Sequence, residues 1–165
     1  MYYQKKISSP IGALFLVTSK SAIVSIDTTT SPLFEAAQFM NDHRILLQTE
    51  VELKQYFQGL RTQFDIPISP TGTSFQLQAW QVLQDIPFGD VLSYKEQALL
   101  MKRPKATRAV GAANGKNPIL IIIPCHRICG ADGKLVGFSG GIEIKIKLLE
   151  LEGHCIQNGK ITQRR

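Results

Sequence analysis

The order of apolar and polar residues predicts a small α+β domain in the first 70 positions. Three short runs rich in β-branched and aromatic residues, bounded by turn-forming residues, are expected to form strands at residues 2–7, 13–18 and 22–27. A short helix is expected to start near Ser31, with Pro32 at the first helical position. Its apolar face would comprise Phe34, Ala37 and Met40.

A longer helix, a further strand and a linker are predicted next. Apolar residues at helical spacing indicate a helix over about residues 46–59, for which Gly59 is a suitable stop. Residues 62–66 are expected to form a last strand. Pro and Gly then cluster in residues 67–72, a composition typical of linkers. The sequence therefore predicts two domains, at residues 1–70 and 73–165.

The second half begins with a helical pattern. Thr73 or Ser74 can cap a helix whose apolar stripe stops before Pro87. Ser93 can cap a second helix over residues 94–101, because Glu96 stands at the third helical position of a capping box.

A third helix completes this pattern. Pro104 is expected to open it, and it should reach about Asn114. A short helix, a tight turn and a helix rich in small residues are the layout of a helix-turn-helix.

A run of five aliphatic residues, 119–123, leads through Pro124 into Cys125, His126 and Arg127. Such a run indicates a short segment buried on all sides, and the proline ring restricts the backbone at its end. Cys125 is thus expected on a rigid stem, where neighbouring positive charge would lower the pKa of its thiol and favour a nucleophilic thiolate. A structural cysteine in the core is the alternative.

The net charge of +6 comes entirely from the second half. Residues 1–70 contain six Lys and Arg and six Asp and Glu, whereas residues 71–165 contain thirteen and seven. This asymmetry suits a polyanionic partner. The chain has neither a run of about twenty apolar residues nor the layout of a signal peptide, so no membrane association is expected.

The three cysteines lie in the last third and include no Cys-x-x-Cys pair. An odd, clustered set is not a disulfide framework and fits a reducing compartment. A zinc site is a weak alternative that would use Cys125, His126, Cys129 and Cys155. We expect no metal and no cofactor.

Pro124-Cys125-His126-Arg127 resembles the active-site signature of the 6-O-alkylguanine-DNA alkyltransferases, which are methylated-DNA–protein-cysteine methyltransferases. Other segments match this family in order and spacing over roughly residues 73–153: Phe75–Trp80, Ile86–Gly89, Ser93-Tyr94, Arg108–Asn114, Asn117-Pro118, Gly137–Gly141, Lys147–Leu149 and Leu151–Gly153.

The resemblance implies a fold and a reaction. A small ribonuclease-H-like α/β domain would precede a helical domain of the winged-helix or helix-turn-helix type. The reaction would be DNA repair by direct reversal, in which Cys125 takes the alkyl group from the 6-oxygen of guanine, with the 4-oxygen of thymine as a second candidate. The thioether would persist, so each molecule would act once.

The resemblance also assigns roles to side chains. His126 would relay the Cys125 proton through a water, and Glu152 would orient the imidazole. Tyr94 would assist the leaving base at its N3 position, and Asn117 would bridge the third helix and the cysteine stem.

Two residues would contact the substrate base or its adduct. Ser139 would contact the oxygen that loses its alkyl group. Phe138, where the family usually has tyrosine, would pack against the alkyl group.

The third predicted helix presents mainly Ala and Gly, which offer no base-specific hydrogen bonds. This suits sequence-independent docking, and the resemblance implies the minor groove of double-stranded DNA that carries alkylated bases. Arg108 would fill the gap left by the flipped nucleotide. Other residues expected at the DNA or the substrate are Lys105, Thr107, Ala109, Gly111, Ala112 and Arg127. A buried helix packed through its small residues is the alternative.

Two further hypotheses are a thiol hydrolase and a non-catalytic sensor of alkylated DNA. Sensors related to this family lack the cysteine, whereas Cys125 is present. The family's N-terminal zinc site is not expected, because no cysteine precedes Cys125 and the only early histidine is His43. We expect a monomer in the cytoplasm, associated with the nucleoid or nucleus.

Overall fold

Two structural units make up the computed structural model, which describes residues 1–163. The first comprises residues 1–71 together with 118–120, and the second comprises residues 72–117 and 121–165. Residues 164 and 165, the end of the predicted second domain, lie outside the described residues. Within residues 1–163, no helix combines the length and the apolar character that a membrane span requires.

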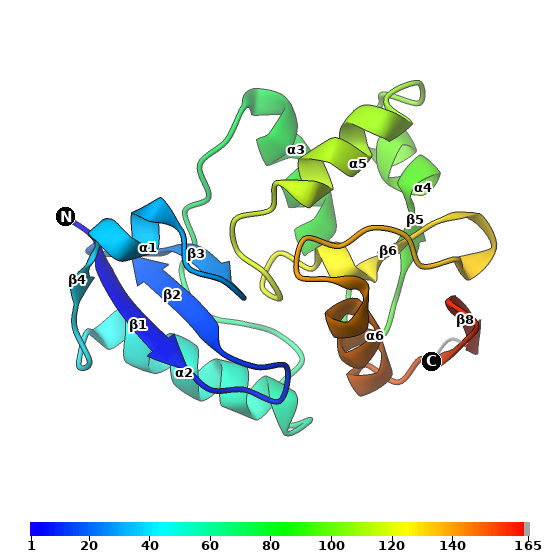
Figure 1. Ribbon diagram of the computed structural model, residues 1–165. Coiled ribbons are helices and arrows are strands. Elements are labelled where there is room, and N and C mark those ends of the chain that lie inside the picture. The colour runs from blue at the N-terminus through cyan, green and yellow to red at the C-terminus, as the bar shows by residue number, and fades with distance from the viewer. Residues whose placement is uncertain (164–165) are drawn as a thin grey trace. The chain divides into compact units, whose positions relative to one another are not determined.

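The first unit is built on a four-stranded sheet with the order β3-β2-β1-β4 (Figure 1). The strands are β1 (Tyr3–Ile7), β2 (Leu14–Thr18), β3 (Ile23–Asp27) and β4 (Gln38–Phe39). The first three strands confirm the predicted ones and pair as antiparallel neighbours, with Lys5 opposite Leu16. β4 was not expected, and it pairs in parallel with β1.

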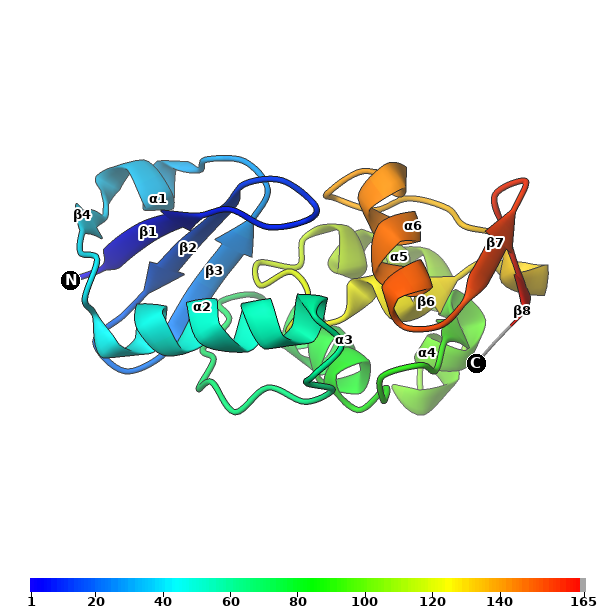
Figure 2. The same ribbon diagram turned by 90° about the horizontal axis from the view of Figure 1, so that it is seen from below.

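Helices α1 (Pro32–Ala36) and α2 (Arg44–Phe57) lie on opposite sides of this sheet in both views (Figures 1 and 2). The predicted helix start is confirmed, and the hydroxyl of Ser31 caps it by accepting a hydrogen bond from the Phe34 amide. The predicted apolar face that included Met40 is wrong, because the helix ends at Ala36 and the chain continues into β4.

α2 begins two residues earlier than expected, because the imidazole of His43 caps it. The ring Nδ1 accepts a hydrogen bond from the Ile45 amide at 3.2 Å. Its predicted stop is confirmed, since Gly59 follows the helix with a φ of 76°, which glycine adopts without strain.

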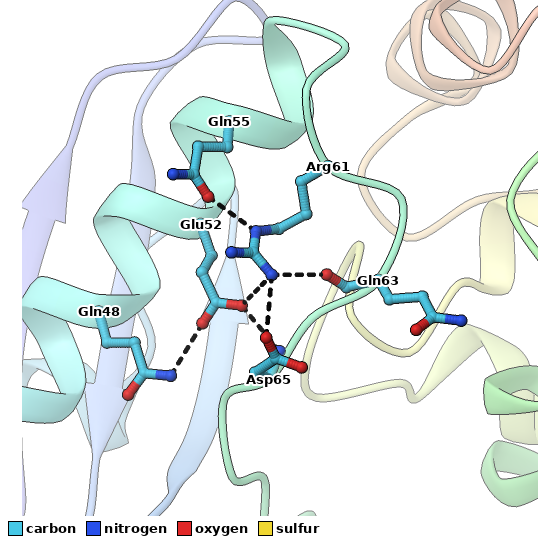
Figure 3. Close-up of polar contacts among 6 residues, drawn as sticks. All are labelled: Gln48, Glu52, Gln55, Arg61, Gln63 and Asp65. Carbon is cyan, nitrogen blue, oxygen red and sulfur yellow. Dashed lines mark hydrogen bonds and ion pairs between the residues drawn. The ribbon is translucent and has the colours of Figure 1, made fainter.

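The strand predicted at residues 62–66 is wrong. Side-chain hydrogen bonds hold this segment instead of a strand ladder (Figure 3). Arg61 Nη1 lies 2.9 Å from Glu52 Oε1 and 3.2 Å from Asp65 Oδ2, and the same atom donates to the carbonyl of Gln63 at 2.9 Å. The sheet contact comes later, at a parallel bridge between Ile23 and Ile68.

The chain returns to the first unit at residues 118–120. Ile119 forms a parallel bridge with Ile26, and the Leu120 amide donates to the Ile26 carbonyl at 3.0 Å. The predicted buried run is therefore interrupted: the chain turns at Ile121, whose φ of 74° is rare for a β-branched residue. Ile122 is only half-buried, whereas the other four aliphatic residues are buried.

Three helices pack together in the second unit: α3 (Ser74–Gln84), α4 (Tyr94–Leu100) and α5 (Thr107–Gly115) (Figure 1). Thr73 and Ser93 cap α3 and α4 through complete capping boxes, as predicted for Ser93. α5 starts at Thr107 rather than at Pro104, because residues 101–106 form turns that include Lys102 at a φ of 58°. The helix-turn-helix layout is thus present.

Buried polar bonds fasten α5 to α3 and α4. Trp80 Nε1 donates to the Ala113 carbonyl at 2.9 Å. The side-chain amides of Gln97 and Asn114 pair reciprocally, at 3.0 and 2.8 Å. Because buried polar groups require specific partners, these bonds fix how α5 sits on the other two helices.

The remaining elements complete the second unit. β5 (Leu92–Ser93) pairs in parallel with β6 (Ile128–Cys129), and β7 (Cys155–Gln157) forms a hairpin with β8 (Lys160–Gln163). Short 3-10 turns occupy η1 (Cys125–Arg127) and η2 (Ala131–Gly133), and the last helix is α6 (Ile142–Leu151). Figure 2 shows α6 beside the segment that carries β6.

Candidate active site

Cys125 opens the 3-10 turn η1, directly after Pro124 and before β6. Its amide donates to the Ile123 carbonyl at 2.8 Å. The residue is only 5% exposed. The thiol is therefore held by a short, tightly bonded segment.

Asn117 connects this segment to the end of α5. Its side-chain Nδ2 donates to the Ile123 carbonyl at 2.7 Å and to Cys125 Sγ at 3.1 Å. A donor at this distance favours the anionic form of sulfur.

Burial nevertheless has the largest effect on the pKa of the Cys125 thiol. It raises the pKa of Cys125 to about 11, although the Asn117 hydrogen bond and the charge of Lys145 act in the opposite direction. The expectation of a lowered pKa is wrong for the protein without DNA. Neither neighbour lowers the thiol pKa as expected, because the Arg127 charge is paired with the Glu152 carboxylate and His126 is neutral.

Glu152 directly follows α6. Its carboxylate bonds to the side chains of His126 and Arg127, the two residues after the cysteine. His126 Nε2 lies 2.7 Å from Glu152 Oε2. The Arg127 guanidinium donates to both carboxylate oxygens, at 2.8 and 3.0 Å, and also to the Ile86 carbonyl at 2.7 Å. All three side chains are buried.

The charges in this cluster follow from its geometry. Burial would raise the pKa of Glu152, but His126 and Arg127 together lower it below its ordinary range, so the carboxylate is ionised. Burial lowers the pKa of His126 despite the attraction of Glu152. Because a carboxylate only accepts, neutral His126 carries its proton on Nε2. Its Nδ1 is then a proton acceptor, and it is buried without a hydrogen-bond partner among the described residues.

Arg127 was expected at the DNA or the substrate, and the structure corrects this. Its side chain is only 7% exposed, and its guanidinium is used by Glu152 and by the Ile86 carbonyl. It therefore supports the His126–Glu152 pair from inside the unit.

Lys145 in α6 was missed at the sequence level. It is 0% exposed, and its Nζ donates to the carbonyls of Val136 at 3.1 Å and Gly137 at 3.4 Å. Burial lowers its pKa to about 8. The sequence offers one sign of its burial: Lys145 stands three residues before Leu148 and thus on the apolar face of the helix, where a lysine is unusual.

Tyr94 begins α4 and also bonds to Val136. Its hydroxyl donates to the Val136 carbonyl at 3.2 Å. Burial, followed by the nearby Cys125 and Cys129, raises the pKa of Tyr94, so the hydroxyl keeps its proton at neutral pH.

A cavity of about 180 Å³ reaches the thiol. It is lined by Tyr94, Gly111, Asn114, Gly115, Cys125, Gly137, Phe138 and Ser139. The structure thus brings together the expected Cys125, Tyr94, Gly111, Phe138 and Ser139, while Asn117, His126 and Glu152 do not line the cavity.

The other expected DNA contacts do not line this cavity. Five of them lie exposed on α5 or just before it: Lys105, Thr107, Arg108, Ala109 and Ala112. Val110, Ala113 and Asn114 form the buried side of the same helix. The hypothesis of a helix packed through its small residues is thus confirmed for one face of α5, while the exposed face leaves DNA docking a prediction.

A larger cavity of about 420 Å³ lies elsewhere in the second unit, between the end of α3 and the loop that precedes β5. Neither cysteine nor histidine lines it, so the smaller cavity is the candidate reaction site. Within residues 1–163, no three His, Cys, Asp or Glu side chains are grouped so that they could hold a metal ion.

Two family models match this chain. Residues 74–154 match the DNA-binding domain of 6-O-methylguanine DNA methyltransferase, and residues 1–70 match its ribonuclease-like domain. The resemblance and the fold class inferred from the sequence are thereby confirmed.

Curated relatives span nearly the whole chain. The methylated-DNA–protein-cysteine methyltransferase of Methanosarcina barkeri is 40% identical over 154 residues, which cover 92% of this chain and 97% of the relative. The protein of the same name from Mycobacterium leprae is 40% identical over 159 residues, with 94% and 95% covered.

Solved structures agree. The crystal structure of Mycobacterium tuberculosis O6-methylguanine methyltransferase superposes with a TM-score of 0.86 at 41% identity and covers 92% of this chain and 93% of that one. A crystal structure of Mycobacterium tuberculosis OGT in complex with DNA gives a TM-score of 0.86 at 41% identity, with 91% and 92% covered.

Proposed function

The chain belongs to the 6-O-methylguanine DNA methyltransferase family, and from this premise we propose that it repairs alkylated DNA by moving the alkyl group to its own Cys125. The substrate is guanine alkylated at its 6-oxygen, with thymine alkylated at its 4-oxygen as a second candidate. The observation that carries the proposal is a buried thiol that faces a cavity, accepts a hydrogen bond from Asn117, and precedes a His126–Glu152 pair.

DNA binding is assigned to the exposed face of α5. Lys105, just before α5, and Thr107 offer phosphate contacts, and Ala109 and Ala112 allow close approach of the backbone. The curated relatives are named for methylated DNA, and one solved relative was crystallised with DNA. Docking in the minor groove without sequence preference suits a helix that presents small side chains.

The reaction requires an extruded base, because an alkyl group inside a stacked duplex cannot reach a buried thiol. Arg108 is exposed on α5 and is assigned to the gap that the flipped nucleotide leaves. The cavity beside Cys125 receives the base between Tyr94, Phe138 and Ser139.

The transfer is an in-line displacement at carbon. The Cys125 proton passes through a water to Nδ1 of His126, and Glu152 stabilises the imidazolium. Sulfur then forms a bond to the alkyl carbon while the bond from that carbon to the guanine oxygen breaks. Tyr94 donates its proton towards the leaving guanine, and the proton taken by His126 restores the phenol. The products are an S-alkylcysteine and an intact guanine.

The raised pKa of Cys125 fits this sequence of events. A thiol with a pKa of about 11 stays protonated at neutral pH until His126 accepts its proton. The cysteine is thereby protected from adventitious alkylation in the absence of DNA. A free thiol also requires a reducing compartment, so we assign the activity to the cytoplasm, at the nucleoid or nucleus.

The test is intact-mass measurement after incubation with a duplex that contains one methylated guanine. The wild type should gain one methyl group per molecule, and the DNA should lose it. Cys125→Ser should gain none, whereas Cys155→Ser, which removes an exposed thiol, should behave as the wild type. Binding without a change in mass would indicate a sensor, and repeated turnover by one molecule would exclude a stoichiometric transfer.

A further inference from the structure

One backbone carbonyl beside the reaction cavity, that of Val136, has two side-chain donors. The Val136 oxygen accepts a hydrogen bond from the Tyr94 hydroxyl at 3.2 Å and from Lys145 Nζ at 3.1 Å. Lys145 also donates to the next carbonyl, that of Gly137, at 3.4 Å. Gly137, Phe138 and Ser139 line the cavity directly after Val136, so these bonds hold the start of its wall.

The proposed reaction removes one of the two donors. A phenol has a single O–H, and it cannot donate to Val136 and to the leaving guanine at the same time. When Tyr94 turns to the base, the Val136 carbonyl keeps only the donor supplied by Lys145. The wall would otherwise lose its attachment at the moment the base must be aligned.

The burial of Lys145 indicates that it holds the Val136 carbonyl and does not merely fill space in the core. A fully buried ammonium is costly unless specific partners compensate it, and within residues 1–163 no Asp or Glu forms an ion pair with Lys145. Its partners are the carbonyl of Val136 and that of Gly137, which lines the cavity. Its charge also acts on the reacting sulfur, because it opposes the effect of burial on Cys125.

We propose that Lys145 is a positioning residue for the transfer: it holds the Val136–Gly137 backbone in place while the Tyr94 hydroxyl moves to the base. This inference rests on the proposed function. It assigns to α6 a second contribution to the site, separate from that of Glu152 at its end.

Four titratable side chains influence Lys145 or share its contacts. Cys125 and His126 belong to η1, Cys129 belongs to β6, and Tyr94 on α4 shares the Val136 carbonyl. Burial opposes the charged amine and the thiolate forms of Cys125 and Cys129 favour it, with a resulting pKa of about 8 for Lys145. Deprotonation above this pH removes the charge and weakens both carbonyl contacts.

The experiment compares Lys145→Met, Lys145→Arg and Lys147→Met with the wild type. Lys147 lies two residues away on the same helix and is exposed, so it is a matched control for the loss of one positive charge. Single-turnover methyl transfer is measured over a range of DNA concentrations to separate the maximal rate from the half-saturating concentration. Thermal unfolding of each variant is recorded in parallel.

Lys145→Met should lower the maximal rate about tenfold or more, since a charged hydrogen bond is lost, and should change the half-saturating concentration little. Lys147→Met should match the wild type at saturation. Lys145→Arg keeps the charge and should restore part of the rate.

The pH profile supplies the readout that a purely structural role would not change. The wild-type rate should be level while neutral His126 accepts the thiol proton and should bend downward near pH 8, where Lys145 loses its proton. The bend should be absent in Lys145→Met and move to higher pH in Lys145→Arg. Unchanged kinetics in Lys145→Met, or a loss that Lys145→Arg shares with no change in the pH profile, would overturn the inference. A wild type that takes up no methyl group would refute the proposed function itself, and this inference with it.

Discussion

Nε2 of His126 lies 2.7 Å from Oε2 of Glu152, and neither side chain reaches solvent. Arg127 donates hydrogen bonds to both oxygens of the same carboxylate. One ionised group therefore fixes the tautomer of the proposed base and neutralises a buried guanidinium. We therefore expect Glu152 to contribute both to the stability of the fold and to the proposed reaction.

Glu152→Gln should show both roles. It leaves Arg127 with an uncompensated buried charge, which should lower the free energy of unfolding by about 3 kcal/mol. It also removes the partner of the imidazolium, so the methyl-transfer rate of the folded fraction should fall. Chemical denaturation and single-turnover kinetics measure the two effects. Glu150→Gln, an exposed position on the same helix, is the control and should change neither quantity.

The pH dependence of stability follows from the same pair. The pKa of Glu152 is lowered in the folded state, so its contribution is complete above the unfolded pKa of about 4.3 and is lost as pH falls. The wild type should lose stability below about pH 4 more steeply than Glu152→Gln. Parallel acid slopes for the two proteins would argue against an ionised Glu152 in the folded state.

Asn117→Ala should make Cys125 less reactive towards iodoacetamide. In the wild type the thiol pKa is about 11, so the labelling rate should rise about tenfold per pH unit between pH 7 and 10. Loss of the Nδ2 donor to sulfur should raise this pKa further and reduce the rate at each pH. Mass mapping after timed labelling gives the rate, and Cys155, which is exposed, serves as an internal reference. A wild-type rate that is flat from pH 7 to 9 would mean that the thiolate already exists at neutral pH.

Two glycines near the cavity should respond differently to alanine. A Cβ on Gly111 would lie 3.7 Å from the Tyr94 ring, which is ordinary contact, and alanine should stabilise α5 by up to about 1 kcal/mol. A Cβ on Gly140 would lie 2.7 Å from the Phe138 ring, so the ring must move. Gly111→Ala should therefore keep methyl transfer, whereas Gly140→Ala should slow it and change the preference for adduct size. Rates with methylated and benzylated guanine in the same duplex test this contrast.

Arg108→Ala should separate base flipping from chemistry. Without the side chain that fills the gap, transfer from duplex DNA should slow about tenfold or more, because unstacking costs a few kcal/mol. Transfer from the free methylated base or from a single strand should persist. Lys20→Ala changes the charge equally at an exposed turn of the first unit and should leave both rates unaltered. Equal losses on duplex and single strand would contradict a role in flipping.

Much of the secondary structure follows from local sequence. The three strands of the first unit, the helix start near Ser31, the Ser93 cap and the helix-turn-helix layout are confirmed, because each depends on residues close together in the chain. The predictions that failed depend on distant partners. Residues 62–66 have strand composition, but Arg61 and Glu52 hold them in an irregular path.

The Pro-Cys-His-Arg signature and its ordered companions were sufficient to identify the family and to nominate the thiol, the histidine, the tyrosine and the carboxylate. Only the tertiary structure determines the pKa values and the hydrogen-bond partners of these residues. Burial raises the pKa of Cys125 despite the charge of Lys145, the Arg127 guanidinium bonds to Glu152, and Lys145 donates to the carbonyls of Val136 and Gly137. Charge and solvation at a buried site depend on which groups surround it in space, and adjacency in the chain does not report them.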